Sequence, residues 1–228
     1  MAPYCAINNM FTLNSTGIAN SILSPGDSSR LKFLPSGPPV CIIDGDVHRT
    51  FDGFDYTYSG YCTYTMVRDS RTHPTFFVIV EHKFHPDVNA RLTEFTVWVK
   101  GRHITGRINP QNMQPLFTDE NNITISVNDE FQVGPDIVVN YDGHNYEITD
   151  RNTLTVIWDG LYRLVITIDK NNLSKIIGMC GNNDGDPGND LRTRGGILID
   201  LEHSSIEDYA RTWEVTNSYV IHLHFFLT

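Results

Sequence analysis

Several patterns that mark common protein classes are missing from this 228-residue chain. Its four cysteines are widely scattered, so it has neither a CxxC pair nor the paired spacing of a zinc knuckle, which excludes zinc-finger and thioredoxin-like chemistry. It also lacks a Gly-x-Ser-x-Gly elbow, a phosphate-binding loop and a dinucleotide fingerprint. We therefore expect a protein that is not an enzyme.

Positive charge is scarce as well. Lysine and arginine total 17 against 27 acidic residues, which gives a formal net charge of −10. This charge opposes binding to phosphate backbones and to anionic membranes, so nucleic acid is not an expected partner. The chain has no run of about twenty apolar residues, and its C-terminal stretch Tyr219–Leu227 is too short to span a bilayer.

Signals for secretion are mixed. Residues 1–9 contain neither a basic n-region nor an apolar h-region, so no signal peptide is seen. Three Asn-x-Ser/Thr sequons, at Asn14, Asn122 and Asn172, are candidate glycosylation sites and suit a secreted protein. If the protein is extracellular, we expect its true start to be missing and the chain to be a fragment.

The chain divides into three parts by composition. Residues 1–39 are rich in serine, asparagine, proline and glycine, which is typical of a linker or of the remnant of an upstream module. At 228 residues the chain is long enough for one large all-β domain with a substantial core or for two small domains, and we favour a single domain over residues 40–216. Residues 217–228 form a short apolar tail, which we interpret as a truncated end or an unrelated extension.

Short alternating runs of aromatic and β-branched residues predict an all-β, antiparallel fold for residues 40–216. The clearest predicted strands are Phe76–Glu81, Leu92–Val99, Ile123–Val127, Asp136–Tyr141, Thr153–Trp158 and Tyr162–Ile168. Helix is scarce. The best candidate is Ser205–Trp213, with Ser205 as the N-cap and acidic residues in its first turn.

Two Asp-Gly pairs predict hairpins. Asp142-Gly143 and Asp159-Gly160 each lie between extended runs, where a type I′ turn would join the strands. In the second hairpin, alternate residues of each strand fall on one face and predict core positions. These residues are Leu154, Val156, Trp158, Leu164, Ile166 and Ile168.

The stretch from Cys180 to Asp190 gathers oxygen-bearing side chains among three glycines and a proline. These side chains belong to Asn182, Asp184, Asp186, Asn189 and Asp190. Calcium takes roughly six to eight oxygen ligands, and magnesium suits such a loop less well because it retains its waters. An EF-hand is excluded, since Pro187 and Thr193 stand where its glycine and glutamate belong. The same composition also occurs in an ordinary surface turn, and a calcium loop of this length needs a further ligand from elsewhere.

Three blocks resemble one known family. Residues 41–64 contain a cysteine, Gly45-Asp46-Val47-His48, Thr50-Phe51-Asp52-Gly53 and then Gly60-Tyr61-Cys62-Thr63-Tyr64. The Cys-Gly-Asn-Asn-Asp-Gly stretch from Cys180 follows, and Ala210-Arg-Thr-Trp-Glu-Val215 comes last. In this order, these blocks resemble the von Willebrand factor type D domain over about residues 40–216. The resemblance implies a secreted, β-sandwich-like domain that binds one calcium ion.

Carried over by position, the resemblance also implies site residues and a function. The calcium ligands would be Asp52, Asn182, Asp184, Asn189 and Asp190, with the backbone carbonyl of Asp186, and Cys41 would pair with Cys180. The implied function is a non-enzymatic, extracellular adhesion or matrix module with a protein partner. A regulator of growth factors of the bone morphogenetic protein class and a vitellogenin-like lipid carrier are the alternatives. The sequence does not indicate an oligomeric state.

Departures from the family pattern carry further expectations. Ile177-Gly-Met-Cys180 has one cysteine where many members have two, so we expect no redox activity. Cys62 lacks its usual downstream partner and is either free or paired with Cys5. Val47 replaces the proline at which some members cleave themselves, which weakens the remaining alternative, a self-processing protein that acts through Asp46 and His48.

Two histidine pairs, His82 with His85 and His222 with His224, are the other metal-ligating candidates. Two histidines without a third ligand are usually solvated surface groups, and we interpret both pairs in that way.

Overall fold

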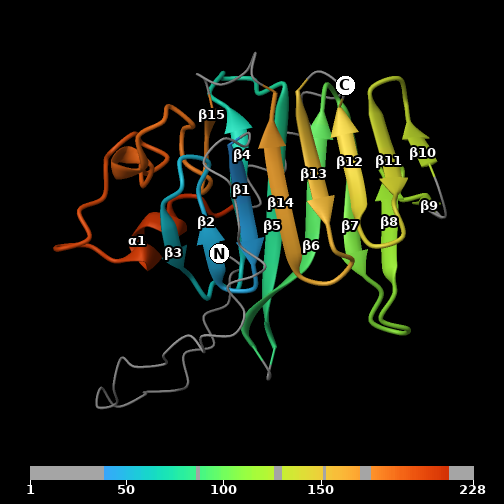
Figure 1. Cartoon of the computed structure of the whole chain (residues 1–228), viewed down its shortest axis with the longest axis horizontal. Coiled ribbons are helices and arrows are strands. Elements are labelled where there is room, and N and C mark those ends of the chain that lie inside the picture. The colour runs from blue at the N-terminus through green and yellow to red at the C-terminus, as the bar shows by residue number, and fades with distance from the viewer. Residues whose placement is uncertain (1–38, 86–87, 126–129, 151–152, 170–175, 216–228) are drawn as a thin grey trace, which may run out of the picture. The chain divides into compact units, whose positions relative to one another are not determined.

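The computed structural model describes residues 39–85, 88–125, 130–150, 153–169 and 176–215 (Figure 1). Within these residues the fold is all-β, with two antiparallel sheets and one short α-helix, as predicted. The predicted linker, residues 1–39, lies outside the described part except for its last residue. The predicted tail, residues 217–228, lies outside it entirely.

The first sheet has eight strands, every neighbouring pair of which is antiparallel. In spatial order they are β10 (Glu130–Val133), β11 (Ile137–Tyr141), β12 (Tyr146–Asp150), β13 (Leu154–Trp158), β14 (Arg163–Ile168), β1 (Val40–Asp44), β2 (Val47–Arg49) and β3 (Asp55–Thr57). The N-terminal strand β1 is therefore inserted between β14 and β2. This insertion brings the turn after β2 toward the chain that follows β14.

The second sheet has seven strands and forms the other layer of the sandwich (Figure 1). In spatial order they are β15 (Ile176–Ile177), β4 (Thr63–Asp69), β5 (Phe76–His85), β6 (Val88–Val99), β7 (Arg102–Ile108), β8 (Pro115–Asp119) and β9 (Thr124–Ile125). The short strand β15 adds to the edge beside β4 and leads directly into the loop that starts at Cys180.

Aromatic side chains from both sheets fill the core between the layers. Trp158 of the first sheet is fully buried and meets Phe95 and Phe117 of the second sheet edge to face, with ring centroids 5.2 and 5.6 Å apart. Such T-shaped contacts are favourable because the positive ring edge faces the negative ring face. The six core positions predicted for the β13–β14 hairpin are all buried, which confirms their assignment.

Each predicted strand is present, but the lengths differ: β5 and β6 are longer than predicted, and one strand is much shorter. The strand predicted at Ile123–Val127 is reduced to Thr124–Ile125 within the described residues. Ile123 lies outside the strand and is 60% exposed, because it follows a tight turn in which Asp119 accepts hydrogen bonds from the backbone. Residues 126 and 127 lie outside the described part of the chain.

The two Asp-Gly hairpins form, but the prediction of type I′ turns is wrong. Gly143 and Gly160 have positive φ angles of 94° and 78°, whereas neither aspartate has one. Instead, Asp159 accepts hydrogen bonds from the backbone nitrogens of Leu161 and Arg163 at 2.8 and 3.0 Å. An aspartate that satisfies backbone donors two and four residues ahead favours a longer loop over a two-residue turn.

The predicted helix is confirmed as α1 (Ile206–Arg211), shorter at both ends. Ser205 is its N-cap and forms a reciprocal capping box with Asp208. Beyond the helix, the Trp213 carbonyl accepts a hydrogen bond from the Thr65 nitrogen, and the Val215 nitrogen donates to the Thr63 carbonyl. The helix is thereby tied to β4, at the end of the sandwich that carries the loop from Cys180 (Figure 1).

Candidate metal centre

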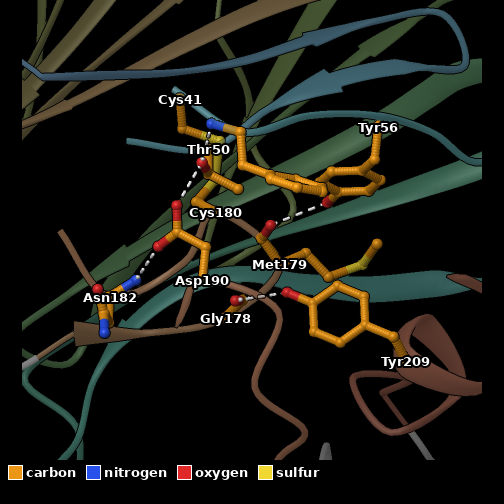
Figure 2. Close-up of a disulfide and its surroundings, with 10 residues drawn as sticks. Cys41, Thr50, Tyr56, Gly178, Met179, Cys180, Asn182, Asp190 and Tyr209 are labelled. Atoms are coloured by element: carbon orange, nitrogen blue, oxygen red, sulfur yellow. Dashed lines mark hydrogen bonds between the residues drawn. A yellow bond between two sulfur atoms is a disulfide. The ribbon is translucent and has the colours of Figure 1, made fainter. Parts of the chain in front are cut away.

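A disulfide joins the two segments that build the site. Cys41 of β1 is bonded to Cys180, with Cα atoms 5.6 Å apart, which confirms the expected pairing (Figure 2). A backbone hydrogen bond of 3.0 Å from the Phe51 nitrogen to the Cys180 carbonyl adds a second link. The turn after β2 and the loop after β15 are therefore held side by side.

Asp52 lies at the tip of a tight turn that closes between Thr50 and Phe54. The Thr50 nitrogen donates to the Phe54 carbonyl at 3.0 Å, and Gly53 takes a positive φ of 93°. The Asp52 carboxylate crosses to the loop and accepts hydrogen bonds from the backbone nitrogens of Asp184 and Gly185, at 3.0 and 2.9 Å. The structure thus brings together a carboxylate and a loop that lie more than 130 residues apart.

Asp190 closes the loop from the interior. Asp190 is 2% exposed, and its carboxylate accepts a 2.5 Å hydrogen bond from the Thr50 hydroxyl and another of 3.1 Å from the Asn182 backbone nitrogen (Figure 2). Burial raises the pKa of the Asp190 carboxyl to about 6, and the nearby negative charge of Asp52 adds to the rise, while the two hydrogen bonds oppose it. A buried carboxylate whose pKa is raised in part by a neighbouring negative charge marks a place where a cation is favoured.

The remaining predicted ligands form a network of their own on the solvent side. The Asn182 side-chain nitrogen donates to Asp184 at 2.9 Å and to the Asn189 amide oxygen at 2.5 Å. The Asn189 side-chain nitrogen in turn donates to Asp184 and Asp186 at 3.0 and 3.2 Å. These bonds, that of Asn189 first, lower the pKa of the exposed Asp184 carboxyl. All six predicted residues are thus linked by hydrogen bonds or charge.

The donor set fits calcium in kind. It consists of carboxylate and amide oxygens, which are the ligands that calcium prefers. Each asparagine amide presents its oxygen in place of its nitrogen when it turns by 180°, so the donors of the network would become ligands. The positions of these atoms fit a single ion less well than their chemical type does, because within the described residues no three of these carboxylates approach within 4.8 Å of one another. Side-chain rotation is therefore needed before they share one ion.

Asp186 has a structural role besides the one expected for it. Its side chain caps the 3-10 turn η2 (Pro187–Asn189) by accepting a 2.9 Å hydrogen bond from the Gly188 nitrogen. Its carbonyl, the expected ligand atom, accepts a 3.2 Å bond from the Asn189 nitrogen. A carbonyl oxygen has two lone pairs, so this bond leaves one for an ion.

Sequence reasoning missed three residues that support the loop. Thr50 binds Asp190 directly, as described above. Tyr56 donates from its hydroxyl to the Met179 carbonyl at 2.8 Å, and Tyr209 of α1 donates to the Gly178 carbonyl at 3.2 Å (Figure 2). Thr50 had a signal, since it stands two residues before Asp52. The tyrosines had none, because an aromatic residue in a strand or helix is ordinarily read as packing.

The two residues of the self-processing alternative, Asp46 and His48, lie in different surroundings. His48 is buried and stacked on Tyr56, and burial lowers its pKa to about 4, so it is neutral near pH 7. Asp46 accepts a long 3.4 Å hydrogen bond from the Ser59 hydroxyl. Within the described residues, neither a hydrogen bond nor an ion pair joins Asp46 to His48.

The interpretation of His82 as a surface group is wrong. His82 is fully buried, and its ring centroid lies 5.6 Å from that of His48. The cause is strand alternation, because His82 continues the inward face of Phe76, Val78 and Val80 on β5. The side chain of its predicted companion His85, and the pair at His222 and His224, lie outside the described part of the chain.

The structure describes Cys62 and one of the three sequons. Cys62 is in a disulfide and is not free. Its proposed partner Cys5 lies outside the described residues, as do Asn14 and Asn172. Asn122 is exposed in the loop before β9.

Comparison with known proteins now decides the family. The von Willebrand factor type D domain profile matches residues 41–197, which is more than half of the chain. The chain belongs to the von Willebrand factor type D (VWD) domain family. The Cys41–Cys180 disulfide and the two-sheet sandwich described above are therefore those of a VWD domain.

Relatives of this VWD domain are much longer proteins. It is 28% identical to SCO-spondin of Rattus norvegicus over 168 residues, which cover 69% of this chain and 3% of that protein. It is 26% identical to zonadhesin of Mus musculus over 200 residues, or 82% of this chain and 3% of that protein. It is 32% identical to mucin-19 of Homo sapiens over 184 residues, or 78% of this chain and 2% of that protein. The chain thus corresponds to a small part of each relative.

Proposed function

We propose that this VWD domain is a calcium-stabilised, non-enzymatic interaction module of an extracellular adhesion or matrix protein. The observation that carries the proposal is the contact of Asp52 with the backbone of Asp184 and Gly185. That contact supplies the distant carboxylate that the loop needs, at the edge of a buried acid, Asp190. A divalent cation there would offset the negative charge that gathers at Asp52 and Asp190.

Residues of both segments would hold the ion. Asp52, Asp184 and Asp190 supply carboxylates, Asn182 and Asn189 supply amide oxygens, and Asp186 supplies its carbonyl. The ion would fix the turn after β2 against the loop after β15. Its role would thus be structural. The sandwich and the disulfide bring the two segments together, and the ion would hold them in a fixed geometry.

An extracellular location is supported by the disulfide chemistry. Two described cysteines form the Cys41–Cys180 bond and Cys62 is also bonded, and disulfides of this kind persist in oxidising compartments. The exposed sequon at Asn122 suits such a location. No helix among the described residues is long and apolar enough to cross a bilayer. The mucin-19 and zonadhesin likenesses support a module within a larger protein.

A calcium-dependent melt tests the proposal. Extracellular modules bind calcium with dissociation constants of about 0.1–1 mM, so about 10 mM calcium stabilises the domain by roughly 1.4–2.7 kcal/mol. For a chain of this size that raises the melting temperature by about 3–10 °C over the value in chelator. We expect this rise in the parent, little of it with magnesium, and none in Asp190→Ala.

An exposed pair of variants separates ligand loss from loss of fold. Asp184→Asn removes one charged ligand at an exposed position, and Asp142→Asn makes the same change in the β11–β12 loop, toward the opposite end of the first sheet from β2. We expect Asp184→Asn to weaken the calcium response and Asp142→Asn to leave it unchanged. An equal rise in all four proteins would place the ion elsewhere, and no rise in the folded parent would show that the loop is an ordinary turn.

A further inference from the structure

A mostly apolar groove lies beside the loop. It encloses about 410 Å³ and is lined by Phe54, Pro187, Gly188, Leu191, Leu198, Ile199, Asp200, Leu201 and Glu202. Phe54 and Ile199 pack against the domain core, whereas Leu198 and Leu201 are 44% and 47% exposed. These two leucines give the groove an apolar floor that is open to solvent.

Backbone bonds hold this groove in shape. The Ile199 nitrogen donates to the Leu191 carbonyl at 2.9 Å, and an isolated bridge pairs Arg192 with Leu198. The Arg192 carbonyl also accepts a 3.1 Å hydrogen bond from the indole nitrogen of buried Trp213. The groove is therefore preformed, which reduces the entropy lost when a ligand binds.

The charged residues of the groove are all acidic. Asp200 and Glu202 line it, and no basic residue does. A hydrogen bond from His203, followed by one from the Glu202 nitrogen, lowers the pKa of the Asp200 carboxyl, so this group stays ionised. Among the described residues, the Glu202 side chain has no bonded partner. The rim thus offers negative charge to a ligand that carries the opposite sign.

The ligand atoms of Asp200, Glu202 and His203 lie within 4.8 Å of one another, which also suits a surface cation. All three residues are exposed, and an ion would make no use of the apolar floor formed by Leu198 and Leu201. A ligand that uses both features has an apolar side chain next to a basic one.

We propose that this groove binds a segment of a protein partner in which an aliphatic or aromatic side chain adjoins lysine or arginine. The apolar side chain would lie over Leu198 and Leu201, and the basic one would face Asp200 and Glu202. One wall, Pro187 and Gly188, belongs to η2 and so to the proposed calcium loop. The inference rests on the proposed function as an interaction module and identifies its binding surface.

The test uses nuclear magnetic resonance of the full chain labelled with ¹⁵N, in calcium. The probe is an end-blocked heptapeptide with arginine, leucine and lysine at its centre and glycine and serine on either side. We expect saturable shifts at the amides of Gly188, Leu198 and Leu201. Replacing the central leucine by alanine, or both basic residues by glutamate, is expected to weaken binding about tenfold or more.

Matched variants locate the contact. Leu201→Ser and Glu202→Lys each remove one feature of the groove, and we expect about tenfold weaker binding from each. Leu161→Ser changes a leucine that is similarly exposed, at 44%, in the β13–β14 loop, and is expected to leave binding unchanged. Absent shifts, equal binding of the acidic peptide, or equal effects of all three variants would overturn the proposal.

The experiment distinguishes binding of a second copy, failure of the groove proposal and failure of the calcium proposal. Shifts that depend on protein concentration without peptide would place a second copy in the groove and overturn the proposal. If calcium raises the melting temperature but the peptide does not bind, only the groove assignment fails. If the peptide binds and calcium has no effect on the melt, only the calcium proposal fails.

Discussion

Gly181 is a residue on which the loop depends directly. Its φ is +80°, and a Cβ at this position would overlap the carboxylate of Asp190. Gly181→Ala is therefore expected to add about 1–2 kcal/mol of left-handed backbone strain and about 1–3 kcal/mol of overpacking. We expect a lower free energy of unfolding in urea and, because Asp190 is displaced, a loss of the calcium-induced rise in melting temperature.

Gly185→Ala is the matched control. Gly185 has a similar φ of +91°, but nothing lies within 4 Å of its added Cβ. This variant carries the strain without the overlap, so its free energy of unfolding should exceed that of Gly181→Ala by roughly 1–3 kcal/mol. Equal losses in the two variants would show that the Asp190 position is not set by Gly181.

The buried histidine pair predicts a pH dependence of stability. Burial lowers the pKa of His48 to about 4 and, together with the charge of His48, that of His82 to about 3. Below pH 6.5 the unfolded chain takes up protons at both residues while the folded chain does not. The contribution of the pair to stability is therefore complete at neutral pH and decreases as the pH is lowered. Between pH 6.5 and 5 the pair is expected to lower the free energy of unfolding by roughly 3 kcal/mol.

A substitution isolates this contribution. Asp190, with its raised pKa, acts in the opposite sense, since it favours the protonated folded state as pH falls. The parent profile is therefore a sum, and the comparison of interest is with His82→Phe, which removes one buried titrating group. We expect its loss of stability between pH 6.5 and 5, measured by urea unfolding, to be smaller by about half of the pair's contribution. An unchanged slope would mean that His82 titrates normally when folded.

Residue-level patterns predicted part of the site. The oxygen-rich composition indicated the loop from Asn182 to Asp190, and the family resemblance added Asp52, which the structure places against Asp184. The burial of His82 was also accessible, because the alternation of Phe76, Val78 and Val80 extends to it. The contact of Thr50 with Asp190 joins residues 140 apart. Local sequence does not contain that information.

At the scale of elements, the chain specifies where strands and the helix occur better than how they are joined. Asp-Gly correctly marked both hairpins. It could not reveal that the Asp142 and Asp159 side chains satisfy backbone donors within longer loops. The helix was easier to predict, because the capping serine and the acidic first turn act within the element itself.

The capping box of α1 carries an element-scale prediction. Ser205→Ala removes the hydroxyl that accepts a 3.1 Å hydrogen bond from the Asp208 nitrogen, and should lower the free energy of unfolding by about 1 kcal/mol. Because α1 holds Tyr209 against Gly178, part of the loss is expected at the base of the proposed calcium loop. Urea unfolding measures the change. Ser204→Ala, at the neighbouring position outside the box, should have little effect, and equal losses would contradict the assignment of Ser205 as the cap.

At the scale of the whole molecule, the sandwich was predictable but its strand order was not. Alternation indicates that a strand has one buried face, and many short strands indicate two layers. It does not indicate the neighbour, because every strand offers the same alternation. The pairing of β1 with β14, in which Val40 lies opposite Thr167, is fixed only by the complete fold. This pairing places Cys41 beside the chain that carries Cys180.

The Cys41–Cys180 bond is the covalent link between the sheet and the loop. It joins residues 139 apart, and in the chain-entropy model a loop of this length stabilises the fold by about 5 kcal/mol. Replacing both cysteines by alanine is therefore expected to lower the free energy of unfolding by roughly 3–5 kcal/mol, measured with guanidinium. The calcium response should weaken too, since Cys180 is the first residue of the loop. A loss below about 1 kcal/mol, or an intact calcium response, would show that the Phe51 and Asp52 hydrogen bonds suffice to hold the two segments together.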